Sequence, residues 1–392
     1  MKKIILYALS VVVCCTLQAQ VLERGVALRL ADGKPVEVTS SHAAPVIYDF
    51  NGDGVKDLIV GEFGEELIDL NDRFVKSKCR VYINKGTDRE PQYADFFYLK
   101  AGGKDVYVAV TCCISFVPRF GDMNGDGIDD LLTGDYYGNI HMFRGEGDGR
   151  YAADDVLYKV NGVSAIAAEP IDWNGDGVLD VLVSQRYGQP LIVINHGTKT
   201  APKFDSQQPL TLEPCNYTQE QMENQVRKSV PSHITTVDFD GDSLFDLVCG
   251  DEEGNLFWYK NVGDKTTALF KTPIMLRDNN IIERPEGELI PIGGRVKVAV
   301  YDYNQDGKLD ILAGDLFAHK RKIRELSPKD EMKKAKLEQK LNECIKECLK
   351  MQAEGKRSKK NDDCLSETTL ELRKYDNYEH RSTGYVWLFL QK

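Results

Sequence analysis

The sequence DMNGDGIDD, from Asp122 to Asp130, is the clearest of five copies of one nine-residue pattern. Every copy places an oxygen-bearing side chain at its first, third, fifth and ninth positions. Carboxylates so close in sequence repel one another unless a cation lies among them, and Asp and Asn oxygens are hard ligands that suit Ca²⁺. A small residue at the sixth position, glycine in four copies, permits the positive φ that turns the chain around the ion. The pattern therefore predicts a calcium-binding loop that is repeated five times.

Each loop also offers a backbone carbonyl at its seventh position, which brings the ligand set to five. The expected metal ligands are Asp49, Asn51, Asp53, Val55, Asp57, Asp122, Asn124, Asp126, Ile128, Asp130, Asp172, Asn174, Asp176, Val178, Asp180, Asp238, Asp240, Asp242, Leu244, Asp246, Asp302, Asn304, Asp306, Lys308 and Asp310. The fourth and fifth copies depart from the pattern at Ser243 and Gln305. For these two copies, the alternative of acidic turns without a metal has more weight than it has for the other three, although a metal site is still expected.

These loops differ from EF-hand loops. An EF-hand has a glutamate at position 12 and a helix on each side. Here position 12 falls inside β-like runs, at Val60, Thr133, Val183, Val248 and Ala313. The sequence therefore predicts that strands, and not helices, flank the loops.

The repeat is larger than the loop, because successive loops start 50 to 73 residues apart. This spacing is typical of a four-stranded propeller blade with variable connections. The strands predicted in the first unit are Pro45–Tyr48, Leu58–Gly61, Arg80–Asn84 and Phe96–Leu99. Those predicted in the second are Val117–Phe120, Leu131–Gly134, Asn139–Arg144 and Val156–Val160. The expected fold class is all-β, a β-propeller of five blades over residues 20–392.

The two ends of the chain predict how the ring closes. Val21–Ser41 is similar to Gln92–Val110, which ends a blade, but no blade precedes it. Tyr385–Leu390 has the composition of a third strand with no fourth strand after it. We therefore expect the N-terminal strand to complete the last blade, which closes the ring and removes the open edge.

The last blade carries a charged insertion over residues 318–383. Ser327 and Pro328 have the residue types of a helix start. A narrow apolar seam follows at Leu337, Leu341, Cys344, Cys348 and Met351. A bond from Cys344 or Cys348 to Cys364 would clasp this arm. The insertion is expected to be helical, and either a partner-binding arm or a solvated hairpin that lies on the propeller.

The first 19 residues have the pattern of a secretory signal. Two lysines precede the apolar run Ile4–Val13, which is too short to span a bilayer, and the small residue Ala19 follows. A lipid anchor at Cys14 or Cys15 is the alternative. No later segment reaches transmembrane length. We therefore expect an exported protein that is periplasmic, attached to the cell surface or extracellular.

Net charge says little about partners. The formal charge is −11, and the aspartates of the five loops account for most of it. Five divalent cations would neutralise nearly all of this charge. The sequence has no basic stripe interleaved with aromatic residues, so we expect no nucleic-acid partner.

The five loops, each followed by an apolar strand, resemble FG-GAP/VCBS repeats. Four of these strands end in Gly-Asp or Gly-Glu, whereas the third unit has Ser184-Gln185 at this place. Such repeats form the calcium-binding blades of integrin α-subunit propellers and of many secreted bacterial proteins. The resemblance covers Val21–Lys392 except the insertion. It implies a propeller with up to five structural Ca²⁺ ions. It names no ligand, because the family serves adhesion, scaffolding and, in some relatives, polysaccharide cleavage.

Blade topology predicts the binding face. The calcium loops lie on one face, and the long irregular segments Glu62–Lys78, Pro214–Ser232 and Asp278–Gly294 lie on the other, together with the insertion. A glycan or protein ligand is expected on this second face, around the channel. The candidate ligand-binding residues are His42, Glu62, Phe63, Asp135, Tyr136, Tyr137, Arg186, Tyr187, His233, Asp251, Arg295 and Asp315.

Two functions fit these residues. One is a non-catalytic binding or scaffold module, and the other is a carbohydrate-active enzyme similar to a polysaccharide lyase. A lyase needs a base and a charge neutraliser, and His42, His233, Arg186 and Arg295 have the required chemistry. The sequence has no nucleophile elbow, P-loop or dinucleotide fingerprint. We favour the binding module, and the catalytic residues of the alternative stay unknown.

Overall fold

The computed structural model describes residues 22–65, 74–110, 114–163, 166–186, 188–213, 231–279, 293–353 and 359–392. The expected signal segment and Tyr187 lie outside these ranges, as does nearly all of Pro214–Ser232. The chain divides into two compact units. One unit is the β-rich part that ends at Leu316 and resumes at Gly384, and the other is the insertion Phe317–Thr383.

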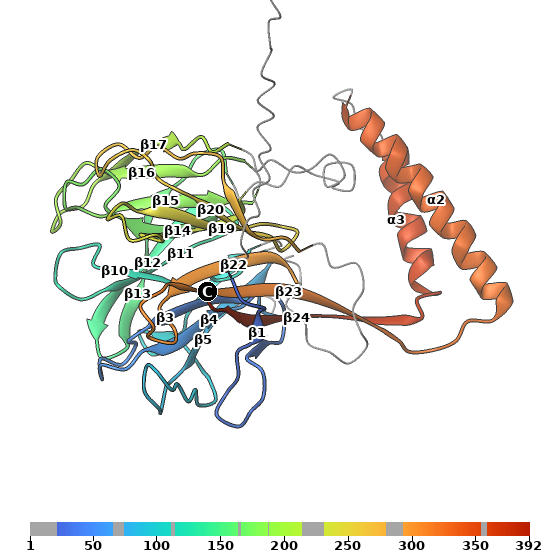
Figure 1. The fold of residues 1–392 in the computed structure, drawn as a ribbon. Helices are drawn as coiled ribbons and strands as arrows, with labels where there is room; N and C mark the ends of the chain where they lie inside the picture. Colours follow the sequence, from blue (N-terminus) through green and yellow to red (C-terminus); the bar gives the residue numbers. More distant parts are fainter. Residues whose placement is uncertain are drawn as a thin grey trace, which may run out of the picture. The chain divides into compact units, whose positions relative to one another are not determined.

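Five antiparallel sheets form the propeller, one around each loop (Figure 1). Blade 1 contains β3 (Ala44–Tyr48), β4 (Asp57–Gly61), β5 (Val75–Tyr82), β6 (Phe97–Tyr98) and the added strand β9 (Tyr107–Val110). Blade 2 contains β10 (Arg119–Gly121), β11 (Asp130–Gly134), β12 (Asn139–Gly147) and β13 (Arg150–Lys159), with the short strands β7 (Lys100–Ala101) and β8 (Lys104–Asp105) beside β13.

The remaining blades have four or five strands each. Blade 3 contains β14 (Ile166–Ile171), β15 (Asp180–Gln185), β16 (Leu191–Asn195) and β17 (Phe204–Pro209). Blade 4 contains β18 (His233–Val237), β19 (Asp246–Gly250), β20 (Leu256–Tyr259) and β21 (Ile274–Arg277). Blade 5 contains β22 (Gly294–Tyr301), β23 (Asp310–Lys322), β24 (Tyr378–Phe389), β1 (Val26–Ala27) and β2 (Glu37–Val38). The predicted five-bladed all-β fold is confirmed.

The ring closes through both ends of the chain, as predicted. Strand β1 pairs with β24 at Val26 and Leu388, and β2 pairs with the same strand at Glu37 and Tyr385. The closure removes the free edge that the last blade would otherwise present. The N-terminal strand and the C-terminal strand therefore belong to one sheet.

One predicted segment differs from the structure. We expected Glu62–Lys78 to be irregular, but β5 already begins at Val75, five residues before the predicted start of the strand. Its extension pairs with β9 in a register that joins Val75 to Val110. This partner comes much later in the chain, so the local residue pattern could not reveal the pairing.

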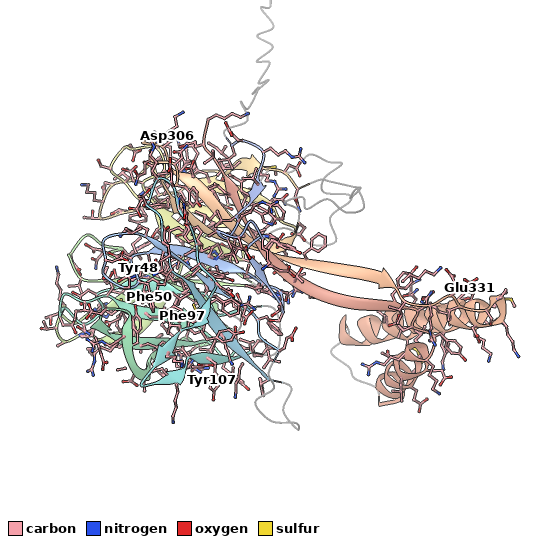
Figure 2. The ribbon with its side chains drawn as sticks, turned by 90° about the horizontal axis from the view of Figure 1, so that it is seen from below. Tyr48, Phe50, Phe97, Tyr107, Asp306 and Glu331 are labelled. Carbon is pink, nitrogen blue, oxygen red and sulfur yellow. A yellow bond between two sulfur atoms is a disulfide. The ribbon has the colours of Figure 1, made fainter. Side chains whose placement is uncertain are left out.

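The core lies between neighbouring sheets. Tyr48 of blade 1 stacks on Phe120 of blade 2, with ring centroids 3.9 Å apart. Phe50 packs edge-on against Phe97, and both lie near Tyr48 in the propeller (Figure 2). Strand β22 packs against β3 and completes the circle of contacts. Each buried aliphatic side chain in these layers contributes about 1.5–3 kcal/mol to stability by its removal from water.

A buried polar cluster crosses the axis of the ring. Arg119 on β10 forms an ion pair with Glu169 on β14, and both side chains are nearly inaccessible to solvent. The Arg119 guanidinium also donates to the Val298 carbonyl of blade 5 at 2.8 Å. The Thr235 hydroxyl of blade 4 donates to Glu169 at 2.8 Å. These contacts link four blades, so the inner strands meet through charged groups as well as apolar ones.

The insertion is helical, as expected. Helix α2 spans Pro328–Ala353 and helix α3 spans Lys359–Arg373. The Ser327 hydroxyl accepts a hydrogen bond from the Asp330 amide at 3.2 Å and caps α2. A disulfide joins Cys344 to Cys364 and therefore ties the two helices together. Within the described residues, neither helix has the length and apolar composition needed to cross a membrane.

Candidate functional site

The five loops share one backbone geometry. In every copy the amide of the sixth residue donates to Oδ2 of the first-position aspartate at 2.9–3.0 Å. The sixth residue has a positive φ in all five copies, including Ser243 at 68°. Gln305 also has a positive φ, of 56°, where the other copies have glycine. Both sequence departures therefore keep the loop conformation.

The ninth-position aspartate clamps each loop to its own blade. Asp57, Asp130, Asp180, Asp246 and Asp310 are fully buried. In every copy Oδ1 accepts a backbone amide at the end of the third strand, at 2.7–2.9 Å. Oδ2 accepts the amide of the second loop residue at 3.0–3.3 Å. The sequence predicted a metal ligand at this position but did not reveal that the residue also holds the blade together.

Burial disfavours the charge on these ninth-position carboxylates. It raises the pKa of all five, and that of Asp130 reaches about 6. Hydrogen bonds from backbone amides offset only part of this burial effect. A cation in the loop would stabilise the charged form.

The first-position aspartates also have a feature that is expected of a cation-binding loop. Among the described residues, the Oδ1 atoms of Asp49, Asp172 and Asp238 are buried without a hydrogen-bond partner. A buried carboxylate oxygen without a partner is costly unless it binds an ion. In the fourth loop, ligand atoms of Asp238, Asp240 and Asp242 all lie within 4.8 Å of one another. The residues present therefore fit a hard divalent cation such as Ca²⁺.

The fourth loop differs from the others in its charges. It has Asp240 at the third position, where the other four loops have asparagine. The ammonium group of Lys260 contacts the carboxylate of Asp240 and lies 2.8 Å from that of Asp242. An internal cation thus accompanies the extra carboxylate of this loop.

On the opposite face, four of the described blade ends meet around Glu252. The Arg186 guanidinium donates twice to Oε2 of Glu252, at 3.0 and 2.7 Å. Nε of Arg295 lies 3.3 Å from the same oxygen, and its NH1 group lies 3.0 Å from Nε2 of His42. Nζ of Lys297 donates to the Arg295 carbonyl at 2.8 Å. We call these five residues the mouth cluster.

The mouth cluster carries more positive than negative charge. Among the described residues, the guanidinium groups of Arg186 and Arg295 both contact the carboxylate of Glu252, and the ammonium group of Lys297 lies close enough for its charge to interact with that carboxylate. The side chains of Arg295 and Glu252 are 29% and 23% exposed, whereas His42 and Lys297 are buried. Burial lowers the pKa of Lys297 to about 7. Burial, together with Lys297 and Arg295, holds the pKa of His42 well below its usual range, so the imidazole is neutral at pH 7.

The structure brings together three of the predicted ligand-binding residues, His42, Arg186 and Arg295. Phe63 stacks on the His42 ring, with centroids 5.3 Å apart. His233 lies in the axial cluster instead, where Nε2 is 3.3 Å from Arg119. The mouth cluster is therefore smaller than the predicted site.

The four acidic candidates at the ends of the second strands hold their own blades together. Asp135 and Asp251 each accept two hydrogen bonds from an asparagine four residues later. Glu62 pairs with Arg80 at 2.6 Å. Asp315 accepts hydrogen bonds from the Tyr385 amide and the Trp387 indole, both at 2.8 Å.

The aromatic candidates also pack locally. Tyr136 and Tyr137 pack edge-on against each other, and Tyr137 packs against Phe74. No described contact joins either tyrosine to the mouth cluster.

Sequence reasoning missed Glu252 and Lys297. Glu252 directly follows the Gly250-Asp251 pair, and Asp251 was predicted to bind the ligand in its place. Lys297 interrupts the apolar run of an inner strand, and this interruption could have marked it as a functional residue. Their importance depends on contacts with other blades, and these contacts have no signature in the local sequence.

Comparisons with known proteins agree with the repeat pattern. A family model described as FG-GAP-like repeat matches residues 122–208 and 238–313. No sequence among the curated proteins matches the chain.

Solved structures give distant similarities. One is described as BBS1N in complex with ARL6DN, soaked with lead, with a TM-score of 0.27 and 18% identity over 52% of this chain and 53% of that chain. The chain thus spans about half the length of that structure. Another is a GH43_1 enzyme from Xanthomonas citri, with a TM-score of 0.36 and 9% identity over 71% of this chain and 82% of that chain. Neither similarity is strong enough to support an argument about function. The matched family model and the five sheets together identify a β-propeller with five blades that contains FG-GAP-like repeats.

Proposed function

We propose that this chain is an exported binding module whose blades are held by structural Ca²⁺ and whose mouth cluster binds an anionic ligand. The observation that carries the binding proposal is the convergence of the Arg186 and Arg295 guanidinium groups, from two different blades, on one carboxylate. Positive side chains at the end of a low-dielectric channel attract a carboxylate and steer its approach. The ligand is a glycan or a protein segment that presents a carboxylate at this mouth.

The cation proposal rests on the loops. The buried Oδ1 atoms without partners and the raised pKa values of the ninth-position carboxylates both favour bound Ca²⁺. The ion would fix the turn between the first and second strands of each blade. It has no direct role at the mouth cluster, which lies on the opposite face.

A short oligogalacturonate tests the binding proposal, because it presents carboxylates on a sugar chain. We expect Arg295→Ala to weaken its binding about ten-fold or more, since a charge-assisted hydrogen bond is lost. Arg144→Ala, which removes an exposed arginine on β12, is the matched control and should bind as the parent does. Binding should also weaken as salt is added. The proposal would be refuted if neither oligogalacturonate nor an acidic peptide of equal charge bound to the chain.

The second candidate function is cleavage of the same glycan by elimination. The neutral imidazole of His42 beside the Arg295 guanidinium favours it, because a base and a charge neutraliser are then adjacent. The same assay separates the two functions by the ultraviolet absorbance of an unsaturated product. Product formation that disappears in His42→Ala would make the chain an enzyme, whereas binding without product makes it a binding module.

A further inference from the structure

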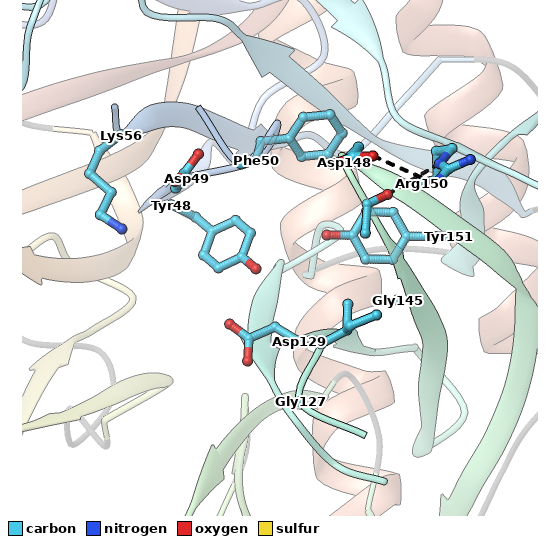
Figure 3. A pocket seen from close by; sticks show the side chains of 14 residues that line it. Tyr48, Asp49, Phe50, Lys56, Gly127, Asp129, Gly145, Asp148, Arg150 and Tyr151 are labelled. Atoms are coloured by element: carbon cyan, nitrogen blue, oxygen red, sulfur yellow. Dashed lines mark hydrogen bonds and ion pairs between the residues drawn. The ribbon is translucent and has the colours of Figure 1, made fainter. Parts of the chain in front are cut away.

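A cavity lies between blades 1 and 2, on the face that carries the calcium loops (Figure 3). Its volume is about 370 Å³, which is within the range of about 300–1,000 Å³ found for small-molecule sites. It is lined by the first loop, by the end of the second loop and by the hairpin that joins β12 to β13. This cavity is on the opposite face from the mouth cluster, and no ligand-binding site was expected here from the sequence.

The aromatic part of the lining is held in place by packing. Tyr48 stacks on Phe120, and its hydroxyl group points toward the carboxylate of Asp129 (Figure 3). Tyr151 is buried, and its ring centroid lies 6.1 Å from that of Phe50. The hairpin backbone at Gly149 lies so close to the Phe50 ring that an added Cβ would be 2.6 Å from it. The walls of the cavity are therefore preorganised, which lowers the entropic cost of binding.

The polar part of the lining is rich in carboxylates. Asp49, Asp129 and Asp148 line the cavity together with Lys56 and Arg150, as Figure 3 shows. Asp148 and Arg150 form an exposed ion pair, 3.6 Å apart, at the tip of the hairpin. Asp148 has a positive φ of 51° and lies beside Gly52 of the neighbouring blade. The hairpin thus presents a carboxylate and a guanidinium at one edge of the cavity.

This combination selects for a particular chemistry. With Asp49 engaged by the proposed calcium ion, the carboxylates of Asp129 and Asp148 face the two cations Lys56 and Arg150, which favours a ligand without net charge. The charged rim disfavours an apolar ligand. Hydroxyl groups can donate to the carboxylates and accept from Lys56 and Arg150. Aromatic rings such as those of Tyr48 and Tyr151 offer an apolar surface to the C–H faces of a sugar ring. Neutral sugars combine many hydroxyl groups with such apolar faces.

We propose that the cavity between blades 1 and 2 is a binding site for a short neutral saccharide. Asp49 is both a wall of the cavity and the first-position ligand expected for the calcium ion of the first loop. An ion that holds Asp49 would therefore also hold one wall of the saccharide site. Calcium and saccharide then strengthen each other's binding, since such coupling is reciprocal.

Calorimetric titration of the full chain in calcium with cellobiose, maltose, lactose and N,N′-diacetylchitobiose tests the site. We expect at least one of them to bind, and Asp148→Ala and Asp129→Ala each to weaken that binding about ten-fold or more. Glu146→Ala removes an exposed carboxylate of the same hairpin that does not line the cavity, and should leave binding unchanged. Arg295→Ala should also leave it unchanged, which separates this site from the mouth cluster.

Two outcomes would overturn the proposal. One is that none of the four disaccharides binds at millimolar concentration in the presence of calcium. The other is that a disaccharide binds equally well to the parent, to Asp129→Ala and to Asp148→Ala. Asp148 is 81% exposed, so its replacement should not disturb folding, and a melting curve checks this. Removal of calcium with EDTA should weaken the binding of a disaccharide that does bind.

Discussion

His233 illustrates how single side chains at the propeller axis are fixed by several blades. Its Nδ1 accepts a hydrogen bond from the Val298 amide at 3.1 Å, and its Nε2 faces the Arg119 guanidinium. Burial holds the pKa of His233 well below its usual value, and the positive charge of Arg119 lowers this pKa further. The imidazole is therefore neutral in the folded protein.

This geometry predicts that acid destabilises the propeller. A histidine whose folded pKa is depressed contributes stability above its unfolded pKa of about 6.5, and this stability is lost as the pH falls below that value. The melting temperature should drop between pH 7 and pH 5, because His42 and His233 both resist protonation. His233→Gln should flatten this slope, whereas His196→Gln, at an exposed position, should not. A slope that is identical in the parent and in His233→Gln would show that His233 is not responsible.

For individual residues, the chemical group that a side chain offers was easier to predict from the sequence than the place of that side chain in the fold. The oxygen atoms of the loops could be assigned because their partners lie within nine residues of chain. His42, Arg186 and Arg295 were placed on the correct face from blade topology alone. Glu252 was missed because it matters through contacts with Arg186 and Arg295, which lie on other blades. Lys297 was missed because its hydrogen bond goes to the backbone of Arg295, which has a positive φ in strand β22.

At the scale of the loop, the fourth copy offsets its extra carboxylate with a lysine of its own blade. Asp240 adds a carboxylate that the other four loops lack, and Lys260 adds the matching ammonium group. In blade 2 the corresponding position, one residue before the amide that binds the ninth-position aspartate, is Arg144. A divalent cation in this loop would therefore compete with Lys260 for the same carboxylates.

Replacement of Lys260 should shift the fourth loop from an internal to an external cation. In EDTA, Lys260→Met should melt at a lower temperature than the parent, because three clustered carboxylates lose their counter-charge. In calcium the difference should shrink or reverse, since the ion takes the place of the ammonium group. Arg144→Met is the control. Equal melting temperatures of Lys260→Met and the parent in EDTA would contradict this account.

Strands flanked by a loop were predicted to within a residue or two, whereas β5 was not. The first and second strands of each blade are fixed by the loop that joins them and by alternating buried positions. The extension of β5 depends on β9, and β7 depends on β13, a strand of the same sheet that comes much later in the chain. Such pairings are decided by tertiary structure, which outweighs local residue preference.

For the whole molecule, we expect the five loops to make the free energy of unfolding depend on the calcium concentration. A ligand that binds only the folded state raises the free energy of unfolding by an amount that grows with its concentration. We expect EDTA to lower the melting temperature and added calcium to restore it. Asp126→Ala should remove part of this dependence, because it deletes one ligand of the second loop. A melting curve that is indifferent to EDTA in both proteins would leave the loops as ordinary turns.

The ring closure has a consequence for how the chain is made. Strand β1 emerges early in synthesis, but its partner β24 comes about 360 residues later. The growing polypeptide must therefore carry β1 without its partner strand until β24 has been made, and a product truncated before β24 can never form the final sheet. Cells that make this protein would need to shield that waiting segment during translation, and a premature stop would yield an open circle prone to self-association.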